Sequence, residues 1–185
     1  LRRQRQMCIR DRPSRLTSEE IVLTGKYKSS ILYAPYGQAE LDQAREMLAS
    51  IGGQELIGRS YASLSQGEKQ LLLIARSLMK KPELLILDEA TSGLDLFARE
   101  RLLDQIGKIT QMDQAPTILY VTHHVEEITA AMDHVLLLKE GEIIAQGPKE
   151  DILQKVVMDR FYPQPVELIE LGEDRYFVKV EVRSS

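Results

Sequence analysis

The stretch LLILDEATSGLD, residues 84–95, decides the fold. It begins with four consecutive apolar residues, a short run without alternation that is typical of a parallel strand covered on both faces. A second run of this kind, TILYV at 117–121, follows a segment from Leu96 to Ile109 that has helical periodicity. A strand, a helix and a strand in this order favour a right-handed crossover and therefore a parallel sheet. We expect an α/β fold.

Further elements flank this unit on both sides. Ala39 to Leu48 and Ser65 to Met79 have the apolar spacing of amphipathic helices, and the second stops before Lys81-Pro82 because proline disfavours helix in its predecessor. Downstream we expect a strand at 134–139, a turn at Glu140-Gly141, an edge strand at 142–146, a helix within 148–160 and a small hairpin at 167–182.

The composition is that of an ordinary soluble domain. Of the 185 residues, 43% are hydrophobic and 28% are charged. No apolar run approaches the roughly 20 residues that a membrane-spanning helix needs, so any membrane role has to come through a partner. The single cysteine, Cys8, excludes an internal disulfide and favours a reducing compartment such as the cytosol.

The basic charge gathers at one end of the chain. Residues 1–15 hold six arginines and one aspartate, whereas the rest of the chain has 18 basic and 27 acidic residues. A basic arm that grips nucleic acid is one interpretation, but no aromatic or groove-reading helix accompanies it, and we expect no nucleic acid partner. We favour a disordered tail or sequence foreign to the domain, and we leave these residues out of the fold.

A helix start with an unusual glycine precedes the strand. In LSQGE, residues 64–68, Ser65 and Glu68 have the spacing of a capping box, in which each side chain satisfies the other's backbone N–H. That box does not explain Gly67, which costs about 1 kcal/mol in a helix relative to alanine. Glycine lets a backbone approach another group closely, and a helix N-terminus attracts phosphate. The loop is therefore either a simple cap or a cap that also contacts phosphate.

Polar side chains follow both expected strands. Asp88 and Glu89 stand at the carboxyl end of the first, where α/β sheets bind their ligands. Because successive strand side chains point to opposite faces, one carboxylate can lie near a magnesium ion while the other orients a water molecule. The alternative is a pair of solvated acids. His123 emerges after the next strand on the same rim, and Asp95 can cap the intervening helix.

Four ordered motifs resemble the ABC ATPase family: LSQGE at 64–68, LLILDE at 84–89, SGLD at 92–95 and VTH at 121–123. The similarity covers about residues 16–155, and EGEIIAQG at 140–147 also resembles an edge hairpin of transporter-type members. The resemblance implies a partial P-loop NTPase core of the ABC type, with a parallel sheet and a helical subdomain before the catalytic strand. The expected division is a tail at 1–15, a helical subdomain at 16–80, a catalytic core at 81–160 and a C-terminal hairpin extension at 161–185.

The resemblance implies that the loop at 64–68 binds nucleotide. Ser65, Gln66 and Gly67, with Glu68 in the same loop, would contact the γ-phosphate of an ATP molecule bound mainly to the opposite subunit. Asp95 would communicate across the dimer.

The same resemblance gives roles to the residues that follow the strands. Asp88 would support Mg²⁺, and Glu89 would act as general base or orient the attacking water. His123 would sense the γ-phosphate.

One family motif has no counterpart. The phosphate loop, G-x-x-x-x-G-K-[ST], cradles phosphates with backbone N–H groups and a lysine. Gly25-Lys26 precedes Tyr27 and Gly107-Lys108 precedes Ile109, so neither pair belongs to such a loop. In this family the loop lies well upstream of Ser65, and we expect that the chain begins too late to include it. We therefore expect a fragment that neither holds ATP tightly nor turns it over alone.

The leading functional hypothesis is the ATP-hydrolysing subunit of an ABC transporter, peripheral on the inner face of the cell membrane. Its expected partners are a second ATPase subunit, with ATP at the dimer interface, and separate transmembrane subunits. One alternative is a soluble ABC ATPase of DNA repair or translation, although the long coiled coil or tandem copy of such proteins is not visible. Another is a non-catalytic interaction module.

Overall fold

The computed structural model describes residues 16–27, 36–172 and 174–181. The chain divides into two compact units at the junction between Val121 and Thr122. The predicted tail at 1–15 lies outside the described residues, and the predicted boundaries after 80 and 160 stay predictions. No helix of the described ranges is long and apolar enough to cross a membrane.

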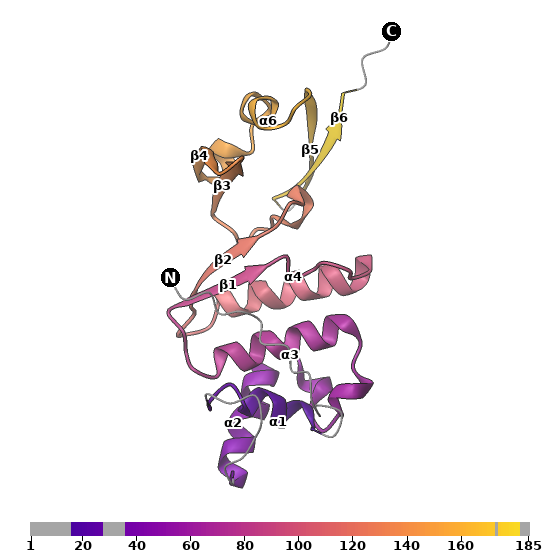
Figure 1. Ribbon diagram of the computed structural model, residues 1–185, viewed down its shortest axis with the longest axis vertical. Coiled ribbons are helices and arrows are strands. Elements are labelled where there is room, and N and C mark those ends of the chain that lie inside the picture. The colour runs from indigo at the N-terminus through magenta and orange to yellow at the C-terminus, as the bar shows by residue number, and fades with distance from the viewer. Residues whose placement is uncertain (1–15, 28–35, 173, 182–185) are drawn as a thin grey trace. The chain divides into compact units, whose positions relative to one another are not determined.

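The first unit combines helices with one pair of strands (Figure 1). Its described elements are α1 Ser18–Leu23, α2 Gln38–Ser50, the 3-10 helices η2 Gln54–Leu56 and η3 Tyr61–Ser63, α3 Gln66–Leu78, β1 Leu84–Asp88, α4 Leu96–Thr110 and β2 Thr117–Val121. The helices predicted around 39–48, 65–79 and 96–109 and the strands predicted at 84–87 and 117–121 are confirmed.

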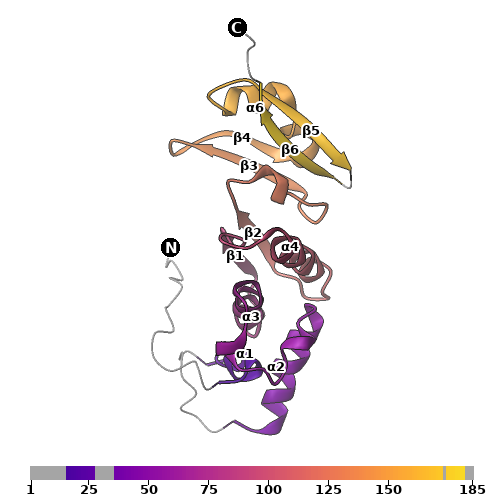
Figure 2. The same cartoon turned by 90° about the vertical axis from the view of Figure 1, so that its right-hand side faces the viewer.

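The two strands are parallel, and the register runs from Leu84 opposite Thr117 to Asp88 opposite Val121. Helix α4 makes the crossover between them and lies beside both strands in the two views (Figures 1 and 2). The predicted α/β fold with a parallel sheet is therefore confirmed.

Only one face of this strand pair is buried by described residues. Leu85 and Leu87 are each 6% exposed, whereas Leu84 is 52% and Ile86 is 57% exposed. The expectation of a strand covered on both faces is wrong for the described part of the chain. An unbroken apolar run does not say which face finds a partner, and here the helices cover one face only.

The core of this unit explains why α3 forms where it does. Five of its residues recur at helical spacing and are all buried: Leu71, Leu72, Ile74, Ala75 and Leu78. They join one apolar cluster with the inward faces of α2, α4 and β1. Burying one such leucine side chain contributes about 1.5–3 kcal/mol, so this stripe fixes the helix against its neighbours.

The second unit contains two β-hairpins and short helices. Its described elements are η4 Val125–Glu127, β3 His134–Lys139, β4 Glu142–Pro148, α5 Lys149–Ile152, α6 Lys155–Phe161, β5 Val166–Gly172 and β6 Arg175–Val180. The first hairpin turns at Glu140 and Gly141, whose φ angles of 53° and 85° are those of a tight two-residue turn. Both predicted hairpins are confirmed.

The helix predicted within 148–160 is two short helices. Gln154 is extended, with φ −118° and ψ 142°, and separates α5 from α6. Ile152, Leu153 and Met158 are all buried in the core of this unit. In one continuous helix these three side chains would point in widely different directions, because successive residues are turned by about 100°. The break lets all of them face the core.

Candidate functional site

Helix α3 begins with the predicted capping box. The Ser65 hydroxyl accepts the N–H of Glu68 at 3.3 Å, and a Glu68 carboxylate oxygen accepts the N–H of Ser65 at 2.7 Å. Both side chains therefore satisfy backbone donors that the first turn of a helix leaves without intrahelical partners. The site residues Ser65, Gln66, Gly67 and Glu68 occupy the first turn of one helix.

Glu68 has a second partner that sequence spacing did not reveal. Arg59 donates from Nη1 to Oε1 of Glu68 at 2.5 Å and from Nη2 to Oε2 at 3.3 Å. Burial raises the pKa of Glu68, but hydrogen bonds from Arg59 and Ser65 outweigh it, and the pKa lies below its usual value. No local spacing rule links two residues nine positions apart, so only the folded loop brings them together.

Gly67 packs against the start of α4. A Cβ atom at Gly67 would lie 3.3 Å from Cβ of Ala98 and 3.8 Å from Cδ2 of Leu94. Asp95 caps α4, as predicted, by accepting the N–H of Ala98 at 2.9 Å. The loop at 64–68 and the Asp95 turn, which are about 30 residues apart in the chain, therefore meet within the first unit.

Asp88 and Glu89 stand at the carboxyl end of β1, and both are exposed. Asp88 follows the strand alternation and shares a face with Leu84 and Ile86. Glu89 leaves the strand with a φ of 47°, and its N–H donates to the carbonyl of Val121, the last residue of β2, at 2.9 Å. The left-handed region costs a non-glycine residue about 1–2 kcal/mol, and such backbone strain is common at functional sites.

The turn after β2 carries His123 and is held by a chain of hydrogen bonds. The N–H of His124 donates to the Thr122 hydroxyl at 3.0 Å, which in turn donates to Oε2 of Glu127 at 2.6 Å. Glu127 is 1% exposed, whereas His123 is exposed. Sequence reasoning missed Glu127, although a glutamate directly after the histidine turn could have been considered as its support.

His123 belongs to the second unit, and Asp88 and Glu89 belong to the first. Their meeting on one rim stays a prediction. The structure does bring Asp88 and Glu89 together at one strand end, and it joins the Gly67 loop to the Asp95 turn.

The acidic residues at this strand end can supply oxygen ligands of the kind that Mg²⁺ prefers. In the described ranges, no three His, Cys, Asp or Glu side chains cluster as a ready metal cage. Mg²⁺ is commonly bound through only one or two carboxylates together with substrate phosphates and water. Asp88 can supply one such carboxylate, and the remaining ligands would come from nucleotide and solvent.

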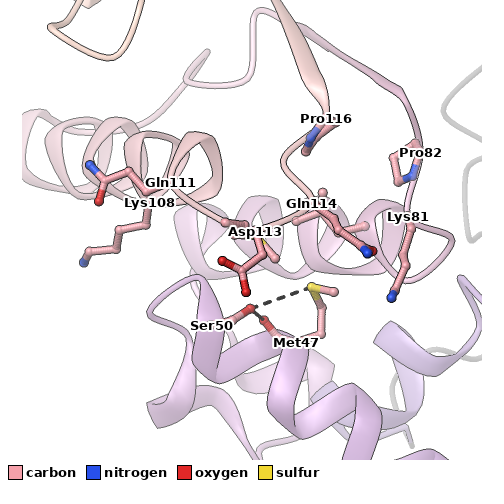
Figure 3. Close-up of a pocket in the computed structure, with 11 residues that line it drawn as sticks. Met47, Ser50, Lys81, Pro82, Lys108, Gln111, Asp113, Gln114 and Pro116 are labelled. Carbon is pink, nitrogen blue, oxygen red and sulfur yellow. Dashed lines mark hydrogen bonds between the residues drawn. The ribbon is translucent and has the colours of Figure 1, made fainter.

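A pocket of about 730 Å³ lies elsewhere in the first unit (Figure 3). Met47 and Ser50 of α2, Lys81 and Pro82 before β1, and the loop after α4 line it. It therefore opens at the amino end of the strands, opposite the end that carries Asp88 and Glu89. None of the predicted site residues lines this pocket, and we assign it no role in the chemistry.

The family assignment comes from comparison with known proteins. A family model described as ABC transporter matches residues 2–92. A Streptococcus mutans protein named as an ABC transporter ATP-binding protein is 63% identical over 170 residues, which cover 92% of this chain and 65% of the relative. The chain belongs to the ABC transporter ATP-binding protein family. A Lactococcus lactis member with the same type of name is 55% identical over 163 residues, covering 88% of this chain and 62% of its own length.

Solved structures agree with the fold of this family member. A metal-chelate type ABC transporter in an inward-facing conformation has a TM-score of 0.73 at 24% identity, over 91% of this chain and 67% of that one. An ATP-binding cassette of another ABC transporter has a TM-score of 0.66 at 20% identity, over 80% of this chain and 64% of that one. The ABC-type α/β fold is confirmed, and the roles of individual site residues stay predictions.

Proposed function

We propose that this ABC family member is the part of a transporter's ATPase subunit that carries the signature loop (residues 64–68), the catalytic strand and the switch histidine. The observation that carries the proposal is the pair Asp88 and Glu89 at the carboxyl end of a parallel strand. A parallel strand that is buried on one face and ends in two exposed acids, the second in a strained conformation, is suited to phosphate chemistry.

In the proposed mechanism, the exposed acids Asp88 and Glu89 have different roles. Asp88 would hold a magnesium ion, which would supply positive charge against the charge that develops on the phosphates. Glu89 would accept a proton from the attacking water or orient that water toward the γ-phosphate. His123 would donate a hydrogen bond to the γ-phosphate from the turn that Thr122 and Glu127 hold.

The signature loop would act on ATP bound mainly to an opposite subunit. The first turn of α3 offers backbone N–H groups and the positive end of a helix dipole, which together favour a phosphate group. Ser65, Gln66 and Gly67 would contact the γ-phosphate there. Asp95 would pass the state of this contact across the dimer, because its turn packs against Gly67 through Leu94 and Ala98.

The phosphate-binding loop would come from another element of the assembled ATPase. The chain spans 65% and 62% of the length of the two relatives described above. A chain that lacks this loop is not expected to bind ATP tightly or hydrolyse it alone. We further propose that the complete subunit works as a dimer with transmembrane partners, peripheral on the inner membrane face.

The test uses a chimeric subunit, defined as the Streptococcus mutans relative with residues 16–185 of this chain in place of its matching segment. We expect this chimera to hydrolyse Mg-ATP. Glu89→Gln should lower kcat by about a hundredfold or more, because it removes the general base. Glu83→Gln, which changes an exposed carboxyl before the same strand, should stay within about twofold of the parent.

Two outcomes would contradict the proposal. One is an active chimera in which Glu89→Gln and Glu83→Gln have equal effects. The other is a folded chimera without ATPase activity beside an active Streptococcus mutans parent, which would favour the non-catalytic interaction module.

A further inference from the structure

We propose that Arg59 is a positioning residue for the signature loop, and that it cancels the charge of Glu68 so that the loop can receive a phosphate anion. This inference rests on the proposed function, because it concerns how the loop meets the γ-phosphate. Arg59 lies outside residues 64–68, so the sequence of the loop does not indicate that it takes part.

The geometry of the pair is that of a clamp. Two guanidinium nitrogens of Arg59 reach the two carboxylate oxygens of Glu68, at 2.5 Å and 3.3 Å. Nη2 also donates to the carbonyl of Ser63, two residues before the helix cap, at 3.2 Å. Arg59 therefore holds both the residue that closes the capping box and the backbone that enters it. Two-point contacts of this kind fix orientation as well as distance.

The backbone of Arg59 is itself fixed against α1. Its carbonyl accepts the N–H of Ser18 at 2.9 Å and the hydroxyl of Ser18 at 3.1 Å. On one side, the N–H of Gly58 donates to Glu19 at 2.9 Å, and on the other side the N–H of Tyr61 donates to Leu16 at 3.0 Å. The guanidinium therefore extends from a segment whose backbone is hydrogen-bonded at Gly58, Arg59 and Tyr61.

Charge explains why the clamp matters for function. The carboxylate of Glu68 is a useful cap because it accepts the Ser65 N–H, but it also places a negative charge in the turn that would meet a phosphate. An unpaired carboxylate within several ångströms of a phosphate group would repel it, and repulsion is strong where water is partly excluded. The Arg59 guanidinium removes that repulsion and keeps the cap. The loop then presents its N–H groups without a net negative charge.

The experiment compares three variants of the chimeric subunit. Arg59→Gln leaves Glu68 uncompensated and should lower kcat/KM for Mg-ATP by about tenfold. The double variant Arg59→Gln with Glu68→Gln removes both charges while keeping an oxygen that can accept the Ser65 N–H, and should recover most of the loss. Lys108→Gln is the control, because Lys108 also pairs with an acid, Asp104 of α4, and has a side chain 49% exposed, against 38% for Arg59. It should leave kcat/KM within about twofold of the parent.

The dependence of kcat/KM on ionic strength distinguishes charge neutralisation by Arg59 from a purely structural role. Salt screens repulsion between partly exposed charges, so the deficit of Arg59→Gln should shrink as salt rises, whereas the double variant should show no such trend. If Arg59→Gln fails to fold because Glu68 is left unpaired, the double variant is compared with the parent instead. A folded double variant with less than about a tenth of the parent's kcat/KM then overturns the inference.

The inference is overturned if the folded double variant is no more active than Arg59→Gln, or if Arg59→Gln and Lys108→Gln have equal effects. Either result beside a large loss from Glu89→Gln would leave the proposed function standing. A chimera that is insensitive to Glu89→Gln would instead count against the proposed function itself.

Discussion

At the scale of single residues, the turn that carries His123 depends on a buried carboxyl. Glu127 is 1% exposed and accepts the Thr122 hydroxyl, which accepts the His124 N–H. Consecutive hydrogen bonds of this kind strengthen one another in a poorly solvated place. We therefore expect the conformation of this turn to depend on Thr122 as much as on the histidines.

Thr122→Val tests this dependence. The substitution keeps the side-chain shape but removes the hydroxyl, so Glu127 loses a donor and the His124 N–H loses its acceptor. We expect the free energy of unfolding to fall by about 1–3 kcal/mol, measured by urea denaturation of the purified chain. Thr117→Val, at an exposed strand position, is the control and should be nearly neutral. Equal effects of the two substitutions would contradict the account.

Residue-level prediction succeeded where a local rule exists. The capping box of Ser65 and Glu68 and the Asp95 cap depend on residues three positions apart, so the sequence reveals them directly. The partners Arg59 and Glu127 lie nine and five positions from the groups they hold, and no helical or strand period connects them. Their roles depend on loop paths that only the folded chain defines.

At the scale of elements, the cap of α3 makes this helix sensitive to acid. The folded-state pKa of Glu68 lies below its ordinary value of 4.5: burial raises it, and the bonds from Arg59 and Ser65 lower it further than burial raises it. A lowered folded-state pKa means that ionised Glu68 stabilises the fold above about pH 4.5. This contribution is lost as the pH falls through the lowered value.

In the Glu68→Gln variant, the free energy of unfolding should therefore fall less steeply as the pH is lowered. Urea unfolding of the chain from about pH 7 to pH 3 should show a steeper loss in the parent than in Glu68→Gln. Glu83→Gln serves as the comparison, because Glu83 is an exposed carboxyl outside any helix cap. If the loss of unfolding free energy with falling pH is the same in Glu68→Gln and in the parent, the Arg59 clamp does not lower the pKa of this carboxyl.

Element types were predictable because apolar spacing differs between helices and strands. The helix at 65–79 and the strand at 84–87 have patterns that match their structures closely. The prediction that β1 is buried on both faces was wrong. An unbroken apolar run indicates a hydrophobic strand but does not show whether a second layer covers it. The break between α5 and α6 was missed because residues 149–160 contain no glycine or proline that would mark the end of a helix.

At the scale of the whole molecule, the last hairpin is part of a core. Val166 of β5 is 1% exposed and packs with Met158 and Ile152 in the second unit. Lys155 donates to the carbonyl of Val166 at 2.8 Å and to Glu181 at 2.6 Å, which ties α6 to both strands at the open end of the hairpin. Sequence alone indicated a small added hairpin at 167–182, because turn signals do not show which surface a hairpin covers.

Ending the chain after Phe161 should therefore unfold the second unit selectively. The truncation exposes Met158 and Ile152, so amides of β3 and β4 should lose protection in hydrogen exchange while amides of α3 keep theirs. Val166→Ala is a milder companion, because it opens a small cavity without removing the hairpin, and should lower stability by about 1–3 kcal/mol. Unchanged protection of β3 and β4 in the truncated chain would show that the hairpin is only an appendage.

The central proposal for the whole chain is a division of labour: its residues would act on ATP phosphates, and another part of the ATPase would hold those phosphates. The most direct test is Mg-ATP hydrolysis by the purified 185-residue chain, measured beside the chimeric subunit at equal concentration. The account predicts a background rate for the chain and hydrolysis by the chimera that Glu89→Gln abolishes. Hydrolysis by the chain alone, well above background and lost on Glu89→Gln, would contradict it.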